Sequence, residues 1–398
     1  MSSRSTPSPG VDCLTPRLGA SAMSGRPKKR PKGKTPNGGP ARLVGLPKVC
    51  PAKKAMKRRG NLFSQIIDRD NIELAYYKAR KGKAWQRTVK RIDNNRDEAL
   101  SRLQNDLGAE RFTTSPYKIK KIYEPKERDI YILPFYPDRI VQHALMNVLE
   151  SIWTPLFIYD SYACIPGRGL HAGSRRTMEF VRRYKYFLKC DISKFYPSIN
   201  HDIMYSIVEQ KIKCKPTLRL IRDVIYSIPG GRNVPIGNYT SQWKGNLYLN
   251  ELDMFIKQRL RVKGYIRYCD DFCLFSNYKQ ELQKWRDEIR GFLWNQLKLC
   301  FSKAELAPVS QGVDFLGYRH FPNKILLRKS TARRVRRRLA KLPHLYRSGR
   351  INLEQYRSSI ASTWGWLQWA NTYNFRIAIQ LQELQEDVDG LRHTEAVQ

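Results

Sequence analysis

The sequence predicts an α+β protein in which helices cover an antiparallel sheet. Between residues 184 and 319, short apolar segments typical of strands alternate with segments of helical period, an order that favours this fold class. The 8 Trp, 22 Tyr and 15 Phe residues exclude a chain that is disordered along its whole length. No run of about 20 apolar residues and no apolar N-terminal signal is present, so we expect a cytoplasmic protein without a membrane span.

The charge of the chain favours a polyanionic partner. Its 398 residues include 73 Lys and Arg against 35 Asp and Glu, a formal charge of +38. Each phosphate neutralised by Lys or Arg releases counterions, so nucleic acid is the partner we expect. The alternative is a basic surface that only maintains solubility, although such surfaces usually mix both signs. The eight cysteines show no C-x-x-C spacing, which argues against a zinc site or a disulfide framework, and we interpret them as reduced thiols, mostly in the core.

Composition divides the chain into three predicted regions. Residues 1–60 contain 15 basic residues, one acid and 17 Pro and Gly, which predicts a disordered basic N-terminal arm. Residues 61–322 contain the predicted sheet and its helices. After Pro322, apolar strands around 325–327 lead into a helical and very basic segment, so we place a further domain at residues 323–398.

Helices and a hairpin open the folded region. Apolar residues recur at helical spacing over 62–76 and again over 95–107. Residues 117–123 alternate in character and 129–133 return beside them, which predicts a basic β-hairpin that turns at 124–128. A long helix should then begin with Asp138 as its N-cap.

The remaining segments supply the predicted sheet. We expect a strand over 184–192, a hairpin over 265–275 and a strand pair at 298–306 and 313–319. Helices are expected between these strands, at residues 200–212, 215–228, 240–258 and 279–296.

Three acids at strand ends indicate a metal site. Asp270 and Asp271 lie between two apolar, aromatic segments, which predicts a tight turn between buried strands, and Asp191 lies near the end of another apolar strand. Burying such carboxylates is costly unless a cation neutralises them, and Mg²⁺ binds carboxylates together with substrate phosphates. Two ions about 4 Å apart would activate a primer hydroxyl and stabilise a pyrophosphate leaving group. For Asp270 and Asp271 taken alone, the alternative is an ordinary hairpin turn.

Four motifs, in order along the chain, resemble those of reverse transcriptases. Tyr268-Cys-Asp-Asp271 is similar to their Tyr-x-Asp-Asp motif, 191–196 to their first catalytic motif, 235–242 to their nucleotide-pocket motif and 315–318 to their primer grip. The resemblance covers most of residues 56–375, so residues 1–55 are an extension. Cys269 stands where the family often has Met, Val or Ala.

The finer resemblance is to reverse transcriptases of diversity-generating retroelements. Ile236, Gly237, Ser241 and Gln242 match their Ile-Gly-x-x-x-Ser-Gln pattern, where retroviral, group II intron and retron enzymes usually have Gln-Gly-x-x-x-Ser-Pro. A retron or group II intron type reverse transcriptase remains an alternative. A non-catalytic RNA-binding scaffold is another, against which the intact acids argue.

The resemblance implies a right-hand polymerase fold with fingers, a palm of antiparallel sheet and helices, and a helical thumb. The implied activity is that of an RNA-directed DNA polymerase, which copies a template RNA into error-prone cDNA that is mutagenised at adenines. The implied cofactors are two Mg²⁺ ions, which Mn²⁺ can replace. The implied partners are the template RNA, the RNA/cDNA duplex, deoxynucleoside triphosphates and a small basic accessory variability protein that forms an oligomer.

The resemblance also implies roles for individual residues. The catalytic residues are Asp191, Asp270 and Asp271, and Ile192 joins them in the metal site. The nucleotide-binding residues are Lys126, Arg128, Ile192, Ser193, Phe195, Tyr196, Ile236, Gly237 and Gln242. The primer- and template-binding residues are Phe315, Leu316, Gly317, Tyr318, Arg333, Arg334, Arg336, Arg337 and Arg338.

Several of these roles have structural alternatives. Tyr196 would select deoxynucleotides by colliding with a ribose 2′-OH, or it packs in the core. Lys126 and Arg128 would hold triphosphate oxygens from the hairpin, or they contact the template backbone. The arginines at 333–338, with Val335 and Leu339 on the opposite face, predict an amphipathic helix along a phosphate backbone, whereas the alternative is a solvated face.

Overall fold

The computed structural model describes residues 57–123 and 127–397, with side chains described to residue 390. The chain separates into two units, Met1–Lys48 and Val49–Gln398, and all described residues belong to the second. Most of the predicted arm and Lys126 therefore lie outside the described residues. At the end of that arm, Arg59 pairs with Ile212 in a parallel bridge and the Arg58 guanidinium donates to the Ile212 carbonyl at 2.9 Å. No helix among the described residues has the length and apolar character needed to cross a membrane.

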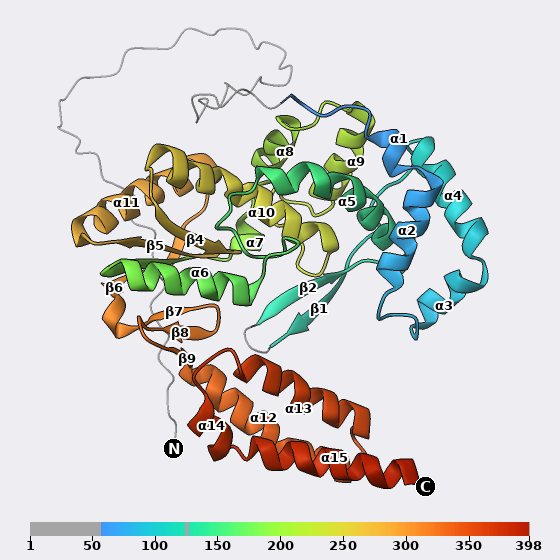
Figure 1. Cartoon of the computed structure of the whole chain (residues 1–398). Helices are drawn as coiled ribbons and strands as arrows, with labels where there is room; N and C mark the ends of the chain where they lie inside the picture. Colours follow the sequence, from blue (N-terminus) through green and yellow to red (C-terminus); the bar gives the residue numbers. More distant parts are fainter. Residues whose placement is uncertain (1–56, 124–126, 398) are drawn as a thin grey trace, which may run out of the picture. The chain divides into compact units, whose positions relative to one another are not determined.

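Short helices and a two-stranded hairpin form the first part of this unit (Figure 1). The Asp68 side chain accepts hydrogen bonds from the amides of Asp70 and Asn71 and so caps the second helix. The apolar face of that helix packs against the long helix α5 (Ile140–Trp153). The elements are α1 (Phe63–Ile66), α2 (Arg69–Arg80), α3 (Arg87–Asn94), α4 (Arg96–Gly108), the antiparallel pair β1 (Lys118–Ile122) and β2 (Arg128–Ile132), and α5 (Ile140–Trp153).

A four-stranded antiparallel sheet with the order β4-β5-β3-β6 lies at the centre of the unit. Its strands are β3 (Tyr186–Ile192), β4 (Gly264–Tyr268), β5 (Asp271–Ser276) and β6 (Phe301–Pro308). The helices around it are α6 (Leu170–Arg183), α7 (Phe195–Ser198), α8 (His201–Glu209), α9 (Lys215–Tyr226), α10 (Tyr239–Met254) and α11 (Lys279–Phe292). An antiparallel sheet with helices confirms the α+β prediction.

The two faces of the sheet belong to different hydrophobic clusters, because successive strand residues point to opposite sides. Phe272 and Leu274 of β5 join the large cluster that includes residues of α10 and α11, whereas Cys273 and Phe275 join the cluster that includes α6. Figure 1 shows α6 and α11 on either side of the sheet. The sheet is therefore buried on both faces, which accounts for its apolar strands.

The C-terminal part contains a small sheet and a group of helices with its own hydrophobic cluster. That cluster includes Leu339, Leu342, Tyr356, Ile360 and Leu367. The elements are the antiparallel strands β7 (Val313–Phe315), β8 (Tyr318–His320) and β9 (Ile325–Leu327), followed by α12 (Lys329–Arg347), α13 (Leu353–Leu367), α14 (Tyr373–Ala378) and α15 (Leu381–Val397). The three-region division stays a prediction.

The structure corrects three local predictions. Asp138 does not cap α5: it is 1% exposed and accepts a hydrogen bond from the Ser115 amide at 2.8 Å, because a π-turn precedes the helix. The segments at 298–306 and 313–319 do not pair with each other, since β6 joins β3 and the second segment is itself a hairpin. Among the described cysteines only Cys190 and Cys273 are buried, so the prediction of mostly core thiols is wrong for this part of the chain.

Candidate active site

The three acids lie at the ends of neighbouring sheet strands. Asp191 is the penultimate residue of β3, and Cys269 and Asp270 form the two-residue turn between β4 and β5, which begins at Asp271. β3 pairs with β5 through Cys190 and Phe272, so Asp191 and Asp271 come next in register. Along their strands, Asp191 and Asp271 lie next to residues of the large hydrophobic cluster. Successive strand residues point to opposite sides, so the two acids point to the other face of the sheet, the face of the cluster that includes α6.

The electrostatics of Asp271 reflect this clustering. Its pKa rises to about 6, chiefly because burial disfavours the charged carboxylate, and the neighbouring Asp191 and Asp270 add to the effect while Lys189 opposes it. Asp191 accepts a hydrogen bond from the Ser302 hydroxyl of β6. Because the two neighbouring carboxylates raise the pKa of Asp271, a bound cation would favour its charged form.

The donor set suits a hard divalent ion. Carboxylates of Asp191, Asp270 and Asp271 and the main-chain oxygen of Ile192 offer only oxygen, which Mg²⁺ and Mn²⁺ prefer. Within the part of the chain that the structure describes, no three His, Cys, Asp or Glu residues are drawn together as a formed metal cluster. The donor chemistry of the acids fits such an ion, and this metal assignment stays a prediction.

A buried ion pair that the sequence analysis missed holds the turn before the acids. Arg267 is 0% exposed in the interior of β4, and its guanidinium donates to Asp253 of α10 at 2.6 and 2.8 Å. It also donates to the Cys269 carbonyl at 3.1 Å and to Asn246 at 3.2 Å. Arg267 is thus a positioning residue for Asp270. The only sequence signal is an arginine inside an apolar strand, which implies a buried partner without identifying it.

Phe195 and Tyr196 follow β3 and pack against α10. Phe195 is 3% exposed and lies in the core, while Tyr196 is partly exposed and close enough to Asp270 for that acid to raise its pKa, after burial as the main cause. A Cβ on Gly245 of α10 would lie 3.1 Å from Phe195 and 3.2 Å from Tyr196. Glycine at that position lets α10 approach both rings. Tyr196 thus packs against α10 and lies near Asp270, and its role in selecting deoxynucleotides stays a prediction.

Tyr196 lines a cavity of about 420 Å³ together with the predicted nucleotide-pocket residues Ile236, Gly237 and Gln242. The Ile236 carbonyl accepts from the Tyr131 amide of β2 at 2.8 Å. A Cβ on Gly237, whose φ is +115°, would lie 2.9 Å from the Tyr131 carbonyl, so only glycine fits there. The fold therefore brings these four predicted residues together beside the hairpin.

Three cations that the sequence analysis did not single out line the same cavity: Lys78, Lys83 and Arg139. Arg139 is partly buried, and no ion pair joins it or Lys83 to an acid among the described residues. Burial, and for Lys83 also the charge of Arg139, lowers the pKa of both side chains. His143 stacks on Tyr239. Its pKa is lowered to about 4, mainly by burial and further by the charges of the three cations. The cavity is therefore electropositive and lacks a neutralising acid among its lining residues.

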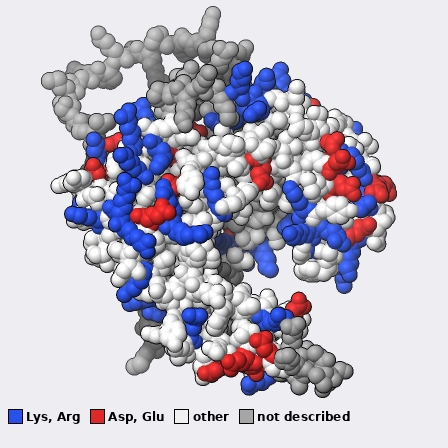
Figure 2. Space-filling model, viewed as in Figure 1, with Lys and Arg blue, Asp and Glu red and all other residues white. Residues whose placement is uncertain are grey.

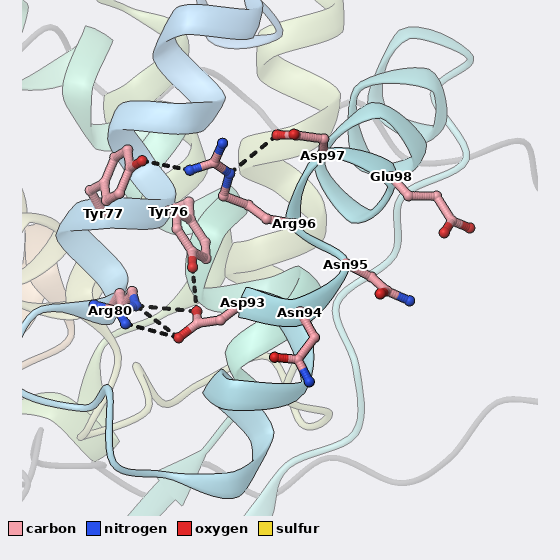
Figure 3. A pocket seen from close by; sticks show the side chains of 9 residues that line it. All are labelled: Tyr76, Tyr77, Arg80, Asp93, Asn94, Asn95, Arg96, Asp97 and Glu98. Carbon is pink, nitrogen blue, oxygen red and sulfur yellow. Dashed lines mark hydrogen bonds and ion pairs between the residues drawn. The ribbon is translucent and has the colours of Figure 1, made fainter.

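A second, larger cavity of about 640 Å³ shows the opposite pattern (Figure 3). It lies among α2, α3 and α4, and there Arg80 binds Asp93 at 2.9 Å and Arg96 binds Asp97 at 3.1 Å. Because its cations already have acidic partners, we assign this cavity no ligand. Of the two cavities, the one beside Tyr196 is therefore the better candidate for binding an anionic ligand, because its cations have no acidic partner among its lining residues.

Ser193 and Arg128 are two of the residues predicted to bind the triphosphate. The Ser193 amide donates to the Cys300 carbonyl at 2.9 Å and is used within the protein. Arg128 is exposed at the start of β2, next to the turn whose Lys126 lies outside the described residues. These nucleotide-binding roles stay predictions.

The predicted primer grip is a turn with buried side chains. Phe315 and Tyr318 are 0% and Leu316 is 7% exposed, and Leu316 and Gly317 at the turn have φ of +57° and +83°. The Tyr318 hydroxyl donates to the Trp366 carbonyl of α13 at 3.2 Å. Tyr318 thus joins β8 to α13, while Phe315 and Leu316 pack in the cluster that includes α6. The primer-grip role of this turn stays a prediction.

The five predicted arginines of α12 are solvent exposed, and Leu339 and Leu342 on the same helix are buried. None of the five forms an ion pair with a described acid. Figure 2 shows further Lys and Arg side chains in several patches on one face of the molecule, together with groups of Asp and Glu. The amphipathic helix is confirmed, and its contact with a phosphate backbone stays a prediction.

The comparisons with known proteins identify the family of the chain. The family model described as reverse transcriptase (RNA-dependent DNA polymerase) matches residues 119–320, which include all three acids and the primer-grip turn. The chain belongs to the reverse transcriptase family, whose members are RNA-directed DNA polymerases.

Individual relatives point to intron-encoded proteins. The chain is 26% identical to Protein YkfC of Escherichia coli, over 51% of this chain and 67% of that protein. It is 22% identical to Group II intron-encoded protein LtrA of Lactococcus lactis, over 52% of this chain and 47% of that protein. It is 27% identical to Nuclear intron maturase 1 of Arabidopsis thaliana, over 26% of this chain and 14% of that protein. The chain thus spans two thirds of the first of these relatives and less than half of the other two.

Proposed function

We propose that this protein copies a template RNA into error-prone cDNA, mutagenised at adenines, for a diversity-generating retroelement. The observation that supports this function is the cavity in which Ile236 and Gln242 lie beside Tyr196. At these two positions the pattern differs from the Gln and Pro usual in retroviral, group II intron and retron reverse transcriptases. An apolar Ile236 offers an incoming base pair no hydrogen bond.

The proposed chemistry begins at the acids. Asp191, Asp270 and Asp271 hold the ions, and two bound Mg²⁺ or Mn²⁺ ions supply Lewis-acid activation of the primer hydroxyl and of the leaving pyrophosphate. Arg267 keeps the turn of Asp270 fixed through the Cys269 carbonyl. Metal binding favours the ionised form of Asp271, whose pKa is otherwise about 6.

The side chains around the cavity position the substrates. The Tyr196 ring, which lines the cavity, is the group that we propose excludes a ribose 2′-hydroxyl. Lys78, Lys83 and Arg139 provide positive charge for phosphates of the nucleic acid or nucleotide. The exposed arginines of α12 bind the RNA/cDNA duplex, and a small basic accessory variability protein is the proposed protein partner.

Sequencing of cDNA tests the fidelity proposal. Ile236→Gln should retain polymerase activity and lower misincorporation opposite template adenine more than opposite the other bases. One positioning hydrogen bond is worth about 0.5–1.5 kcal/mol, or roughly 2- to 13-fold in error rate. Both enzymes should copy the same RNA, with Ile236→Val as a control that adds no hydrogen-bonding group. An equal error spectrum for wild type and Ile236→Gln would remove Ile236 from the fidelity argument.

The second candidate is an intron-type reverse transcriptase, which the names of two relatives favour. Faithful copying by the wild-type enzyme, with errors no more frequent at adenine than elsewhere, would support this candidate instead. A non-catalytic scaffold would bind RNA and extend no primer in the presence of Mg²⁺.

A further inference from the structure

Two thiols far apart in the sequence meet beside the catalytic acids. The side chains of Cys164 and Cys269 lie within hydrogen-bonding reach of each other. The backbone brings the two together, because Ser161 and Arg267 form a parallel bridge. In that bridge the Tyr162 amide donates to the Arg267 carbonyl at 3.0 Å and the Arg267 amide donates to the Asp160 carbonyl at 2.9 Å. The two segments thus run side by side and reach the cysteines within three residues.

The same buried side chains fix both cysteines. Asn246 donates to the carbonyl of Ala163, directly before Cys164, at 2.8 Å, and Arg267 donates to the carbonyl of Cys269 at 3.1 Å. Asn246 and Arg267 are themselves joined at 3.2 Å. Both cysteines have left-handed backbone, with φ of +54° and +55°. The backbone that carries the two cysteines is therefore fixed by buried hydrogen bonds.

We propose that Cys164 and Cys269 form an oxidisable thiol pair that reversibly inactivates the polymerase site. This inference rests on the proposed polymerase function and adds regulation to that site. Cys164 is exposed, so a peroxide reaches its sulfur first. The Cys164 thiolate attacks hydrogen peroxide, gains one oxygen as a sulfenic acid and releases hydroxide. The Cys269 thiol then attacks the sulfur of this sulfenic acid, and water leaves as the disulfide forms. Overall, two thiols and one hydrogen peroxide give one disulfide and two water molecules.

Disulfide formation must move the turn that carries Asp270. Sulfurs in a disulfide lie about 2.05 Å apart, closer than any hydrogen-bonded pair. Cys269 directly precedes Asp270, so drawing Cys269 toward Cys164 displaces the acid or strains the Arg267 contact. A displacement of about 1 Å in a catalytic arrangement costs about 100-fold in rate.

The test uses the full-length protein, oxidised with hydrogen peroxide and then assayed for primer extension with Mg²⁺. Tryptic digestion should yield a cross-link between residues 140–168 and 268–279, and fragmentation should place it on Cys269 rather than Cys273. We expect extension to fall about 100-fold and to return when dithiothreitol is added. Cys164→Ser should be active before oxidation and keep its activity afterwards, whereas the matched Cys214→Ser should be inactivated like the wild type.

Several results would overturn the proposal. One is a digest without the cross-link, another is Cys164→Ser losing activity as fast as the wild type, and a third is a fully cross-linked protein that extends primers normally. If the reduced wild type extends no primer while the cross-link still forms, the polymerase function fails and only the thiol pairing stands.

Discussion

Buried His320 makes the protein sensitive to acid. It is 0% exposed on β8, its Nδ1 contacts the Val313 carbonyl at 3.3 Å, and its Nε2 contacts the Ser174 hydroxyl of α6 at 2.7 Å. Trp369 donates to the same hydroxyl at 2.8 Å. A neutral ring with its proton on Nδ1 satisfies both contacts, because Nε2 then accepts from Ser174. Protonation would remove that acceptor within the junction of α6, β8 and the C-terminal segment.

The size of the effect follows from the pKa. Burial lowers the pKa of His320 from 6.5 to about 4. The folded state thus favours the neutral ring, so the stabilisation is complete above pH 6.5 and is lost as the pH falls toward 4. The full loss is about 3 kcal/mol, and about 2 kcal/mol of it has occurred at pH 5.

The assay is guanidinium denaturation of wild type and His320→Gln at pH 7.5 and pH 5.0. Glutamine keeps a donor and an acceptor but does not titrate in this range. We expect the wild type to lose about 2 kcal/mol more than the variant between the two pH values. His143, whose pKa is also about 4, is present in both proteins, so its contribution cancels.

An equal pH dependence of wild type and His320→Gln would refute this reasoning, whatever the stability of the variant at pH 7.5. The exposed His344 of α12 provides the control: His344→Gln should follow the wild type.

Three further outcomes are expected. Arg267→Met should destabilise the fold by about 3–5 kcal/mol, because it leaves Asp253 buried without its counter-charge, and pairing it with Asp253→Leu should restore most of the stability on denaturation but not primer extension. Asp270→Asn with Asp271→Asn should abolish extension while RNA binding, measured by fluorescence anisotropy, stays within a few-fold, since lysines and arginines elsewhere bind the phosphates. Replacing the five arginines of α12 (Arg333, Arg334, Arg336, Arg337 and Arg338) with Gln should weaken duplex binding and reduce the slope of log K against log[salt] by about 0.7–0.9 for each phosphate that the variant no longer neutralises.

Each of these has a contradicting result. A double variant of Arg267 and Asp253 that extends primers normally would show that the ion pair does not position the turn. Residual extension above background by the double asparagine variant would remove Asp270 and Asp271 from the chemistry. An unchanged salt slope would mean that the exposed face of α12 contacts only solvent.

The sequence determined the features that depend on neighbours along the chain. The turn at Asp270, the strand ending near Asp191, the basic hairpin and the amphipathic α12 all follow from apolar periodicity and from the residues that interrupt it. The local predictions that failed were those in which a distant group competed: Ser115 takes the Asp138 carboxylate that would have capped α5, and β3 takes the strand expected to pair with 313–319.

Only the tertiary structure decided which distant side chains surround the acids. Arg267 of β4 meets Asp253 of α10, and Cys164 meets Cys269, through packing between segments that share no periodic pattern. Lys83, three residues after α2, and Arg139, directly before α5, line one cavity, and α2 packs against α5. Charged residues such as these are common on any basic surface, and their meaning depends on burial and on the absence of an acidic partner. Those quantities exist only once the chain is folded.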